Sequence, residues 1–147
     1  MNTSLYIFNN DTFYNYKVRS ININNVQMYI ANDLINQYNI KNKTNKLFKD
    51  WFRSKDTQEL LNVIRNEKNI PNEPSNNFVE DFNNYGDIKG VIQKIDYYTS
   101  KETYRKEYIV CEELMHDILR FLDPLYTIKI VKFLKNIQSK NYNYSIL

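Results

Sequence analysis

Residues 16 to 30, with the sequence YKVRSININNVQMYI, alternate apolar and polar side chains on both sides of the pair Asn24-Asn25. A period of two is typical of a half-buried β-strand, and paired asparagines tolerate the positive φ angles of a tight turn. This stretch therefore predicts a β-hairpin, which fixes an antiparallel pair of strands near the start of the domain.

Helical spacing follows the hairpin. A first helix is predicted to begin at Ala31. Beyond a basic bend, apolar residues recur at one-turn intervals and predict a second helix with one buried stripe, in front of which Thr44 is a typical N-cap residue. Asp56 and Glu59 have the spacing of a capping box and predict a third helix that begins at Asp56. The stripe of the second helix consists of Leu47, Phe48, Trp51 and Phe52.

The second half of the chain predicts another hairpin and two more helices. Two prolines indicate a loop over residues 66–77. Strands are expected on both sides of residues 100–106, and helices are expected to begin at Glu112 or Glu113 and at Asp123-Pro124. The inner face of the last helix is expected to carry Ile128, Val131, Leu134 and Ile137.

A chain of 147 residues is the size of one ordinary domain. Short helices followed by a hairpin predict an α+β fold, a winged helix-turn-helix-like domain with two β-hairpins and about five short helices. We expect an N-terminal extension over residues 1–15, the domain over residues 16–138 and a flexible tail over residues 139–147.

Several functional classes leave no trace in the sequence. With 2 glycines, the chain has none of the glycine-rich patterns that cradle phosphates. A single Cys111 and a single His116 exclude an internal disulfide and a Cys/His zinc cluster of the usual spacing. Cys111 is expected to be a buried strand residue and His116 a surface or half-buried helix residue. We therefore expect no enzyme, no catalytic residue, no metal or other cofactor and no small-molecule substrate.

Membrane and export signals are also missing. The N-terminus lacks a basic start followed by an apolar run, and the apolar stretches are shorter than the roughly 20 residues that cross a bilayer. We expect an intracellular protein without membrane contact.

Basic residues concentrate in two places, around the bend with the second helix and near the tip of the second hairpin. The net charge of +3 is modest, so their placement carries more information than their number. Cations can hold phosphates, and Asn and Thr at a helix start can contact bases or phosphates. The predicted DNA-binding residues are Lys41, Asn42, Lys43, Thr44, Asn45, Lys46, Lys49, Arg53, Lys94, Lys101, Arg105 and Lys106.

Other interpretations stay open at this point. The basic residues can be ordinary solvated faces, because acidic residues lie among them. Tyr97, Tyr98 and Tyr104 near the hairpin tip could instead anchor a protein partner, since tyrosine is enriched in interfaces. The same tyrosines could stack on the bases of a single-stranded nucleic acid.

Three blocks of the sequence resemble the KilA-N domain of large DNA viruses and phages. Tyr29 to Asn32 is similar to the strand that runs into an Ile-Asn-Ala-Thr-like helix start, and residues 51–61 are similar to the tryptophan helix and the block after it. Residues 108–124 correspond to the last strand and helix, although the family's His-Pro is replaced by Cys111-Glu112 and its later tryptophan by Phe121. The resemblance covers roughly residues 16 to 138.

The resemblance implies a winged-helix-like fold related to that of fungal APSES transcription factors, and it implies binding of double-stranded DNA, with AT-rich DNA as one candidate target. The abundance of Asn, Tyr, Ile and Lys fits an AT-rich viral genome. We therefore expect a viral protein in the host cytoplasm, at the viral factory, or in the nucleus, with a place in the virion and a homodimer left open. Its role would be in transcription or genome organisation.

Overall fold

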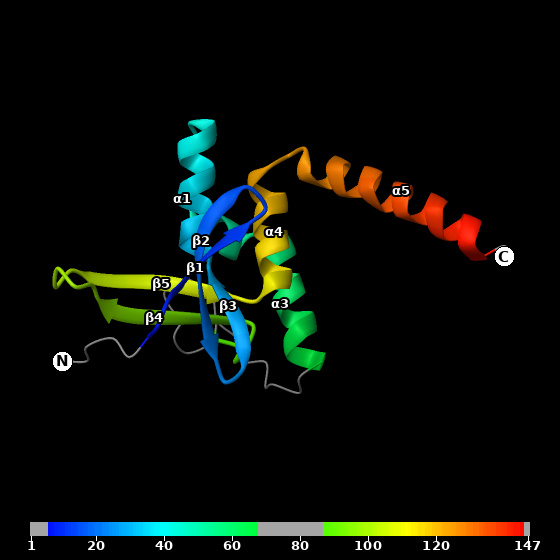
Figure 1. Cartoon of the computed structure of the whole chain (residues 1–147). Helices are drawn as coiled ribbons and strands as arrows, with labels where there is room; N and C mark the ends of the chain where they lie inside the picture. The colour runs from blue at the N-terminus through cyan, green and yellow to red at the C-terminus, as the bar shows by residue number, and fades with distance from the viewer. Residues whose placement is uncertain (1–5, 68–86, 146–147) are drawn as a thin grey trace.

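The structure is a computed structural model that describes residues 6–67 and 87–145. It contains a five-stranded antiparallel sheet with the strand order β1-β2-β3-β5-β4, and helices pack around it (Figure 1). The α+β class is thereby confirmed, whereas the winged-helix arrangement stays a prediction. The elements are β1 (Asn9–Phe13), β2 (Tyr16–Ile23), β3 (Val26–Ile30), α1 (Ala31–Asn42), α2 (Phe48–Arg53), α3 (Lys55–Glu67), β4 (Ile92–Tyr98), β5 (Tyr104–Val110), α4 (Glu112–Leu122) and α5 (Tyr126–Ser145).

The first predicted hairpin is confirmed by β2 and β3. Ile23 pairs with Val26, and Asn24 and Asn25 between them have φ angles of 53° and 66°. These left-handed conformations suit the right-handed twist of the flanking strands, and asparagine adopts them more readily than most residues. The apolar alternation therefore sets the register of this hairpin from local sequence alone.

Strand β1 was not predicted. It lies in the segment expected to be an N-terminal extension, and it pairs with β2 through a tight turn at Tyr14, which has a φ of 53°. Its sequence, NNDTF, is polar at four of five positions, because β1 is an edge strand and most of its side chains face solvent. A polar edge strand carries no apolar alternation from which to predict it.

The second hairpin, β4 and β5, is confirmed, and it joins the first through a short seam. Only Tyr29 and Ile30 of β3 pair with β5, opposite Val110 and Ile109. The Asn32 side chain extends this seam, because its Oδ1 accepts a hydrogen bond from the Tyr108 backbone N–H at 2.8 Å. The first turn of α1 thus takes the place of a further strand residue.

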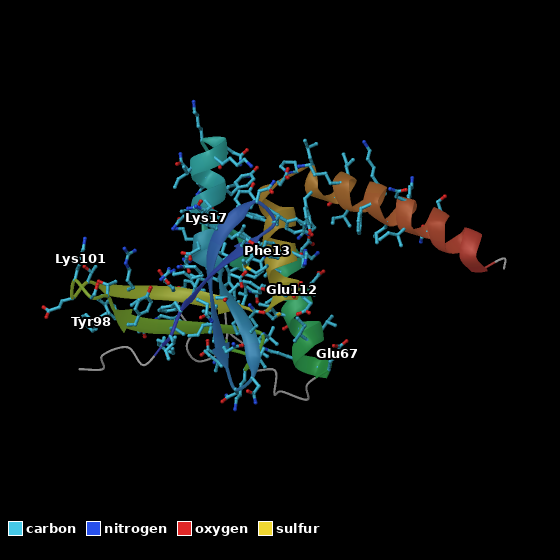
Figure 2. The ribbon with its side chains drawn as sticks, in the orientation of Figure 1. Phe13, Lys17, Glu67, Tyr98, Lys101 and Glu112 are labelled. Atoms are coloured by element: carbon cyan, nitrogen blue, oxygen red, sulfur yellow. The ribbon has the colours of Figure 1, made fainter. Side chains whose placement is uncertain are left out.

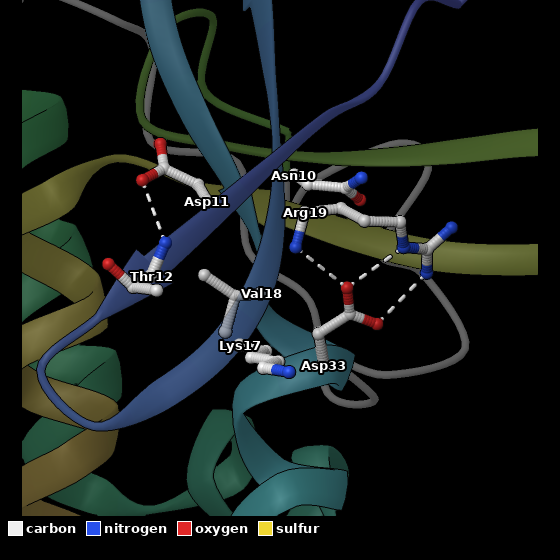
Figure 3. A pocket seen from close by; sticks show the side chains of 7 residues that line it. All are labelled: Asn10, Asp11, Thr12, Lys17, Val18, Arg19 and Asp33. Atoms are coloured by element: carbon white, nitrogen blue, oxygen red, sulfur yellow. Dashed lines mark hydrogen bonds and ion pairs between the residues drawn. The ribbon is translucent and has the colours of Figure 1, made fainter.

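Arg19 on β2 contacts three other elements where the seam ends, and Figure 3 shows its contact with Asp33 of α1. Its Nε and Nη2 atoms donate to the Asp33 carboxylate of α1 at 2.8 and 2.9 Å, and Nη2 also lies 2.8 Å from Glu107 of β5. Its Nη1 donates to the Tyr97 hydroxyl of β4 at 2.6 Å, and that hydroxyl donates to Glu107 at 2.9 Å. The hydrogen bond to Asp33 raises the pKa of Arg19.

The helix starts predicted from capping residues are partly wrong. Residue Leu47, not Thr44, precedes α2, and its side chain is exposed, in contrast to the expected buried stripe. Ser54, not Asp56, caps α3, because its Oγ accepts a hydrogen bond from the Thr57 N–H at 3.2 Å. The buried part of the stripe is Phe48, Trp51 and Phe52.

Helix α4 begins at Glu112 as predicted, but α5 differs from its prediction. Ile128, Val131, Leu134 and Ile137 were expected on an inner face and are all exposed, at 52%, 43%, 50% and 37%. Figure 1 shows the reason, since α5 leaves the body after its first turns and projects away from it. The helix continues to Ser145, past the boundary predicted at residue 138. Residues 66 and 67, predicted as the start of a loop, are the end of α3, and the rest of that predicted loop, residues 68–77, lies outside the described residues.

We predict that Arg19→Met lowers the free energy of unfolding by about 3 kcal/mol, because it leaves Asp33 and the buried Glu107 carboxylate without their cation. Urea unfolding followed by circular dichroism measures the change. Lys17→Met, on the same strand but exposed, is the matched control and should shift the midpoint little. Equal midpoints for the two variants would contradict the role assigned to Arg19.

Candidate nucleic-acid interface

The bend between α1 and α2 is held by one side chain, that of Asn39. Its Oδ1 accepts hydrogen bonds from the Thr44 hydroxyl at 2.8 Å and from the Lys46 backbone N–H at 3.0 Å, and its Nδ2 donates to the Lys46 carbonyl at 2.9 Å. Lys43 ends α1 in the left-handed conformation, with φ 55° and ψ 48°. Asn39 was missed in the sequence because it looks like one more helical asparagine.

The three polar residues predicted at a helix start do not lie there. Asn42 is in the last turn of α1, where its Nδ2 donates to the Tyr38 carbonyl at 3.0 Å. The Thr44 hydroxyl is taken up by Asn39, and Asn45 is an exposed residue of the bend. Helix α2 begins only at Phe48. The predicted helix start is therefore wrong, while a contact of these residues with DNA stays a prediction.

Helix α2 turns its aromatic side chains inward and its basic side chains outward. Trp51 is fully buried, and its Nε1 donates to Asp117 of α4 at 2.8 Å. Lys49 and Arg53 are exposed and lie one turn apart, so they share the outer side of this short helix. Tertiary packing of the aromatics thus determines which way the cations of α2 point.

The second hairpin presents its basic residues on two opposite faces. Side chains alternate between the faces of a strand, so Lys106 shares a face with Tyr104 and Tyr108, whereas Arg105 shares the other face with the buried Glu107. Lys94 pairs directly with Tyr108 and so lies on the Lys106 face. The predicted basic tip is therefore divided between two surfaces.

Helix α2 packs against the face of the hairpin that carries Lys94 and Lys106. The rings of Phe48 and Tyr108 stack in parallel, with centroids 4.0 Å apart and an interplanar angle of 3°. This stack brings together two regions that are far apart in the sequence. We call the outer side of α2, with Lys49 and Arg53, together with the hairpin face of Lys94 and Lys106, the α2–hairpin surface.

Other members of the predicted set lie elsewhere. The Lys41 ammonium lies over the Tyr16 ring, 5.4 Å from its centroid, and the Lys46 ammonium lies over the Phe121 ring of α4 at 5.7 Å. Lys101 is at the distal turn of the hairpin, as Figure 2 shows, and is exposed. The structure therefore separates Lys41, Lys46 and Arg105 from the α2–hairpin surface.

The three tyrosines near the hairpin tip also differ from one another. Tyr97 is buried in the Arg19 network and serves the fold. Tyr98 and Tyr104 pair across the strands with ring centroids 5.4 Å apart, and Tyr104 is 45% exposed. Only these two, of the three, present ring surface beside the basic residues.

Cys111 is buried as predicted but is not a strand residue, and His116 is half-buried. Cys111 directly precedes α4, and burial raises the pKa of its thiol to about 11, so the thiol stays protonated at neutral pH. The His116 Nδ1 lies 2.6 Å from the Tyr126 hydroxyl and 3.4 Å from that of Tyr14, a contact that joins α5 and the β1–β2 turn to α4.

A metal site, a ligand pocket and a membrane-spanning helix each place requirements on the described residues. Residues 6–67 and 87–145 contain no cluster of three or more acidic, His or Cys side chains arranged to hold a metal ion. A hollow of about 640 Å³ beside β1 and β2 is lined by Arg19 and Asp33, which are already bonded to each other (Figure 3). In the described residues, no helix has the length and apolar character needed to cross a bilayer.

Comparison with known proteins gives one family. Residues 13–140 match the family model described as KilA-N domain. No curated protein and no solved structure matches the chain. The matched range includes the turn at Tyr14 and every strand and helix from β2 through α4.

We predict that Asn39→Ala lowers the free energy of unfolding by about 1–2 kcal/mol, because three hydrogen bonds of the bend are lost. The bend should lose more stability than the rest of the domain. Hydrogen exchange at the Thr44 and Lys46 backbone amides should therefore accelerate more than exchange in the sheet. Asn36→Ala is the control, since Asn36 is an exposed residue of the same helix. If both variants exchange alike, Asn39 does not organise the bend.

Proposed function

The chain belongs to the KilA-N domain family, which is generally DNA-binding, and from this premise we propose that the protein binds duplex DNA through the α2–hairpin surface. The observation that carries the proposal is the stack of Phe48 on Tyr108, with centroids 4.0 Å apart. It joins a helix with two exposed cations to a hairpin face that carries the half-buried Lys94 and the exposed Lys106. A DNA groove and the phosphate backbones on either side of it are contacted by an extended protein surface, such as one formed by a helix and a hairpin together.

The charge distribution supports the same surface. On its α2 side the surface carries two exposed cations, Lys49 and Arg53, and one exposed carboxylate, that of Asp50. Among the residues of β4 and β5, the hairpin face of this surface carries Lys94 and Lys106 and one carboxylate, that of Asp96, and Lys101 lies at the turn. Such cations bind phosphates irrespective of sequence, which makes affinity depend on salt.

Direct contact with bases is proposed for the bend. Asn45 is exposed there, next to the exposed Lys43, while the Asn42 and Thr44 side chains are engaged within the protein. An asparagine side chain can make two hydrogen bonds to an adenine edge. Asn45 is therefore our candidate for base recognition, and Lys43 a candidate for the adjacent phosphate.

A second candidate function is supported by Tyr98 and Tyr104. Their rings pair on the hairpin face that also carries Lys106, and Tyr104 is 45% exposed. Aromatic rings beside cations can stack on unpaired bases, so single-stranded nucleic acid is the alternative ligand. A protein partner anchored by the same tyrosines is the other alternative.

The biological setting follows from the family and from composition. We propose a non-catalytic protein of a large DNA virus that acts on viral DNA in the cytoplasm or nucleus of the host. The excess of residues with AT-rich codons supports an AT-rich genome as its origin.

We predict submicromolar binding of a labelled AT-rich duplex, measured by fluorescence anisotropy at several salt concentrations. If the surface neutralises about six phosphates, the logarithm of the binding constant should fall against the logarithm of salt concentration with a slope of about −5. Competition with unlabelled single strands separates the two nucleic-acid hypotheses. Binding that single strands displace better than duplex would favour stacking by Tyr98 and Tyr104, and no binding at low salt would favour a protein partner.

A pair of neighbouring variants tests which face of the hairpin is used. Lys106→Ala should weaken duplex binding by about fivefold and reduce the salt slope by about 0.9, as expected for the loss of one phosphate contact. Arg105→Ala removes the same charge one residue away but on the opposite face, and should leave binding nearly unchanged. The reverse ranking would place the DNA on the other side of the hairpin.

A further inference from the structure

Helix α5 is attached to the body at its first turns and then leaves it. Tyr126 is 9% exposed and Ile130 is half-buried against the core. Every described side chain from Val131 to Ser139 is exposed, and Figure 1 shows the helix pointing away from the sheet and the other helices. Over residues 131–139, the helix therefore leaves its described side chains exposed in a single copy.

The projecting part of α5 is amphipathic. Ile130, Leu134 and Ile137 have the spacing i, i+4 and i+7 and form one stripe, which we call the α5 stripe. Lys132 and Lys135 lie away from the stripe, and the described residues of α5 include no carboxylate. Helices in proteins gain most of their stability from packing an apolar face.

A groove lies where the α5 stripe begins. It has a volume of about 430 Å³, and its lining includes Leu60 and Ile64 of α3, Leu114 of α4 and Ile130 of α5. We call it the α3–α4 groove. Because Ile130 belongs to both, the apolar lining of the groove continues directly into the stripe.

The charges around the groove complement those of α5. Glu113 lines it, and the exposed Glu67 lies on α3. Arg120 and Asp117 also line the groove, but the Arg120 Nε donates to Asp117 at 3.0 Å, so these two charges are paired with each other. A basic amphipathic helix laid along the groove would bring lysines close to carboxylates.

The α5 stripe cannot cover the groove of its own chain, because α5 diverges from α3 and α4 beyond Ile130 (Figure 1). A second copy supplies both missing surfaces at once, a stripe for the groove and a groove for the stripe. In a two-fold dimer this contact forms twice, so the buried area is doubled. Exchange of a terminal helix between identical chains is a low-cost route to such a dimer.

We propose that two copies of this chain form a two-fold dimer in which α5 of each copy lies in the α3–α4 groove of the other. The surfaces involved are separate from the α2–hairpin surface, so the dimer does not depend on the proposed DNA binding. It would, however, present two DNA-binding surfaces on one particle.

The first test is the mass of the full chain in solution, measured by light scattering or sedimentation velocity over a range of micromolar concentrations. The wild type should be dimeric, and Leu134→Glu should be monomeric, because it places a carboxylate in the apolar stripe. Asn136→Glu adds the same charge two residues away and off the stripe, so it should remain dimeric. A monomeric wild type, or a dimer that persists in Leu134→Glu, would overturn the proposal.

A complementation experiment tests the exchange itself. Ile64→Glu damages the groove and should also give monomers. Mixed with Leu134→Glu, it should restore a heterodimer, since the intact α5 of one chain then meets the intact groove of the other. The proposed exchange would be overturned if the two variants form no heterodimer when they are mixed. It would also be overturned if Ile64→Glu alone dimerises like the wild type.

The groove variant needs a check on folding, because Ile64 is packed against the core. Circular dichroism supplies it, and Glu113→Lys is a second groove variant at an exposed position. Glu113→Lys should weaken the dimer, and Lys135→Glu in the partner chain should restore it. Binding of wild-type monomers to anionic vesicles would assign the stripe to a lipid surface and would overturn the proposal.

Discussion

The side chain of Arg19 is the point on which the arrangement of this domain depends. It contacts Asp33, Glu107 and Tyr97, and thereby links β2 with α1, β5 and β4. The two carboxylates lie where solvent is scarce, with side-chain exposures of 19% and 8%, and such groups are costly unless a cation and hydrogen bonds compensate them. The guanidinium satisfies both, because its planar array of donors can serve several acceptors at once.

This polar junction matters because the two hairpins share little else. The ladder between β3 and β5 has two residue pairs, extended by the Asn32 side chain. Beyond this ladder, the hydrogen bonds of Arg19 attach the β4–β5 hairpin to β2, and the stack of Phe48 on Tyr108 attaches it to α2. These contacts fix the direction of the β4–β5 hairpin relative to the rest of the domain. A surface that is already ordered in this way loses less conformational entropy when it binds a ligand.

Local sequence was a good guide wherever a local rule decides the structure. The Asn24-Asn25 turn, the start of α1 at Ala31 and the hairpin of β4 and β5 could be predicted because alternation and turn chemistry act within a few residues. Helix caps were predicted less well, since Thr44, Ser54 and Asp56 all have the chemistry of a cap. Which of them caps a helix depends on where the aromatic residues of α2 are buried. Strand β1 was missed because an edge strand needs no apolar pattern.

For the candidate site, the sequence by itself determined which residues are basic, which are aromatic and which elements carry them. The tertiary structure decided how they are shared among surfaces. Arg105 and Lys106 lie on opposite faces of the hairpin because side chains alternate along a strand, and tertiary packing decides that the Lys106 face is the one beside α2. The amphipathic pattern of α5 was likewise evident in the sequence, but its packing was not. A periodic pattern specifies that a face should be buried, while the surface that buries it is set by contacts between residues far apart in the chain.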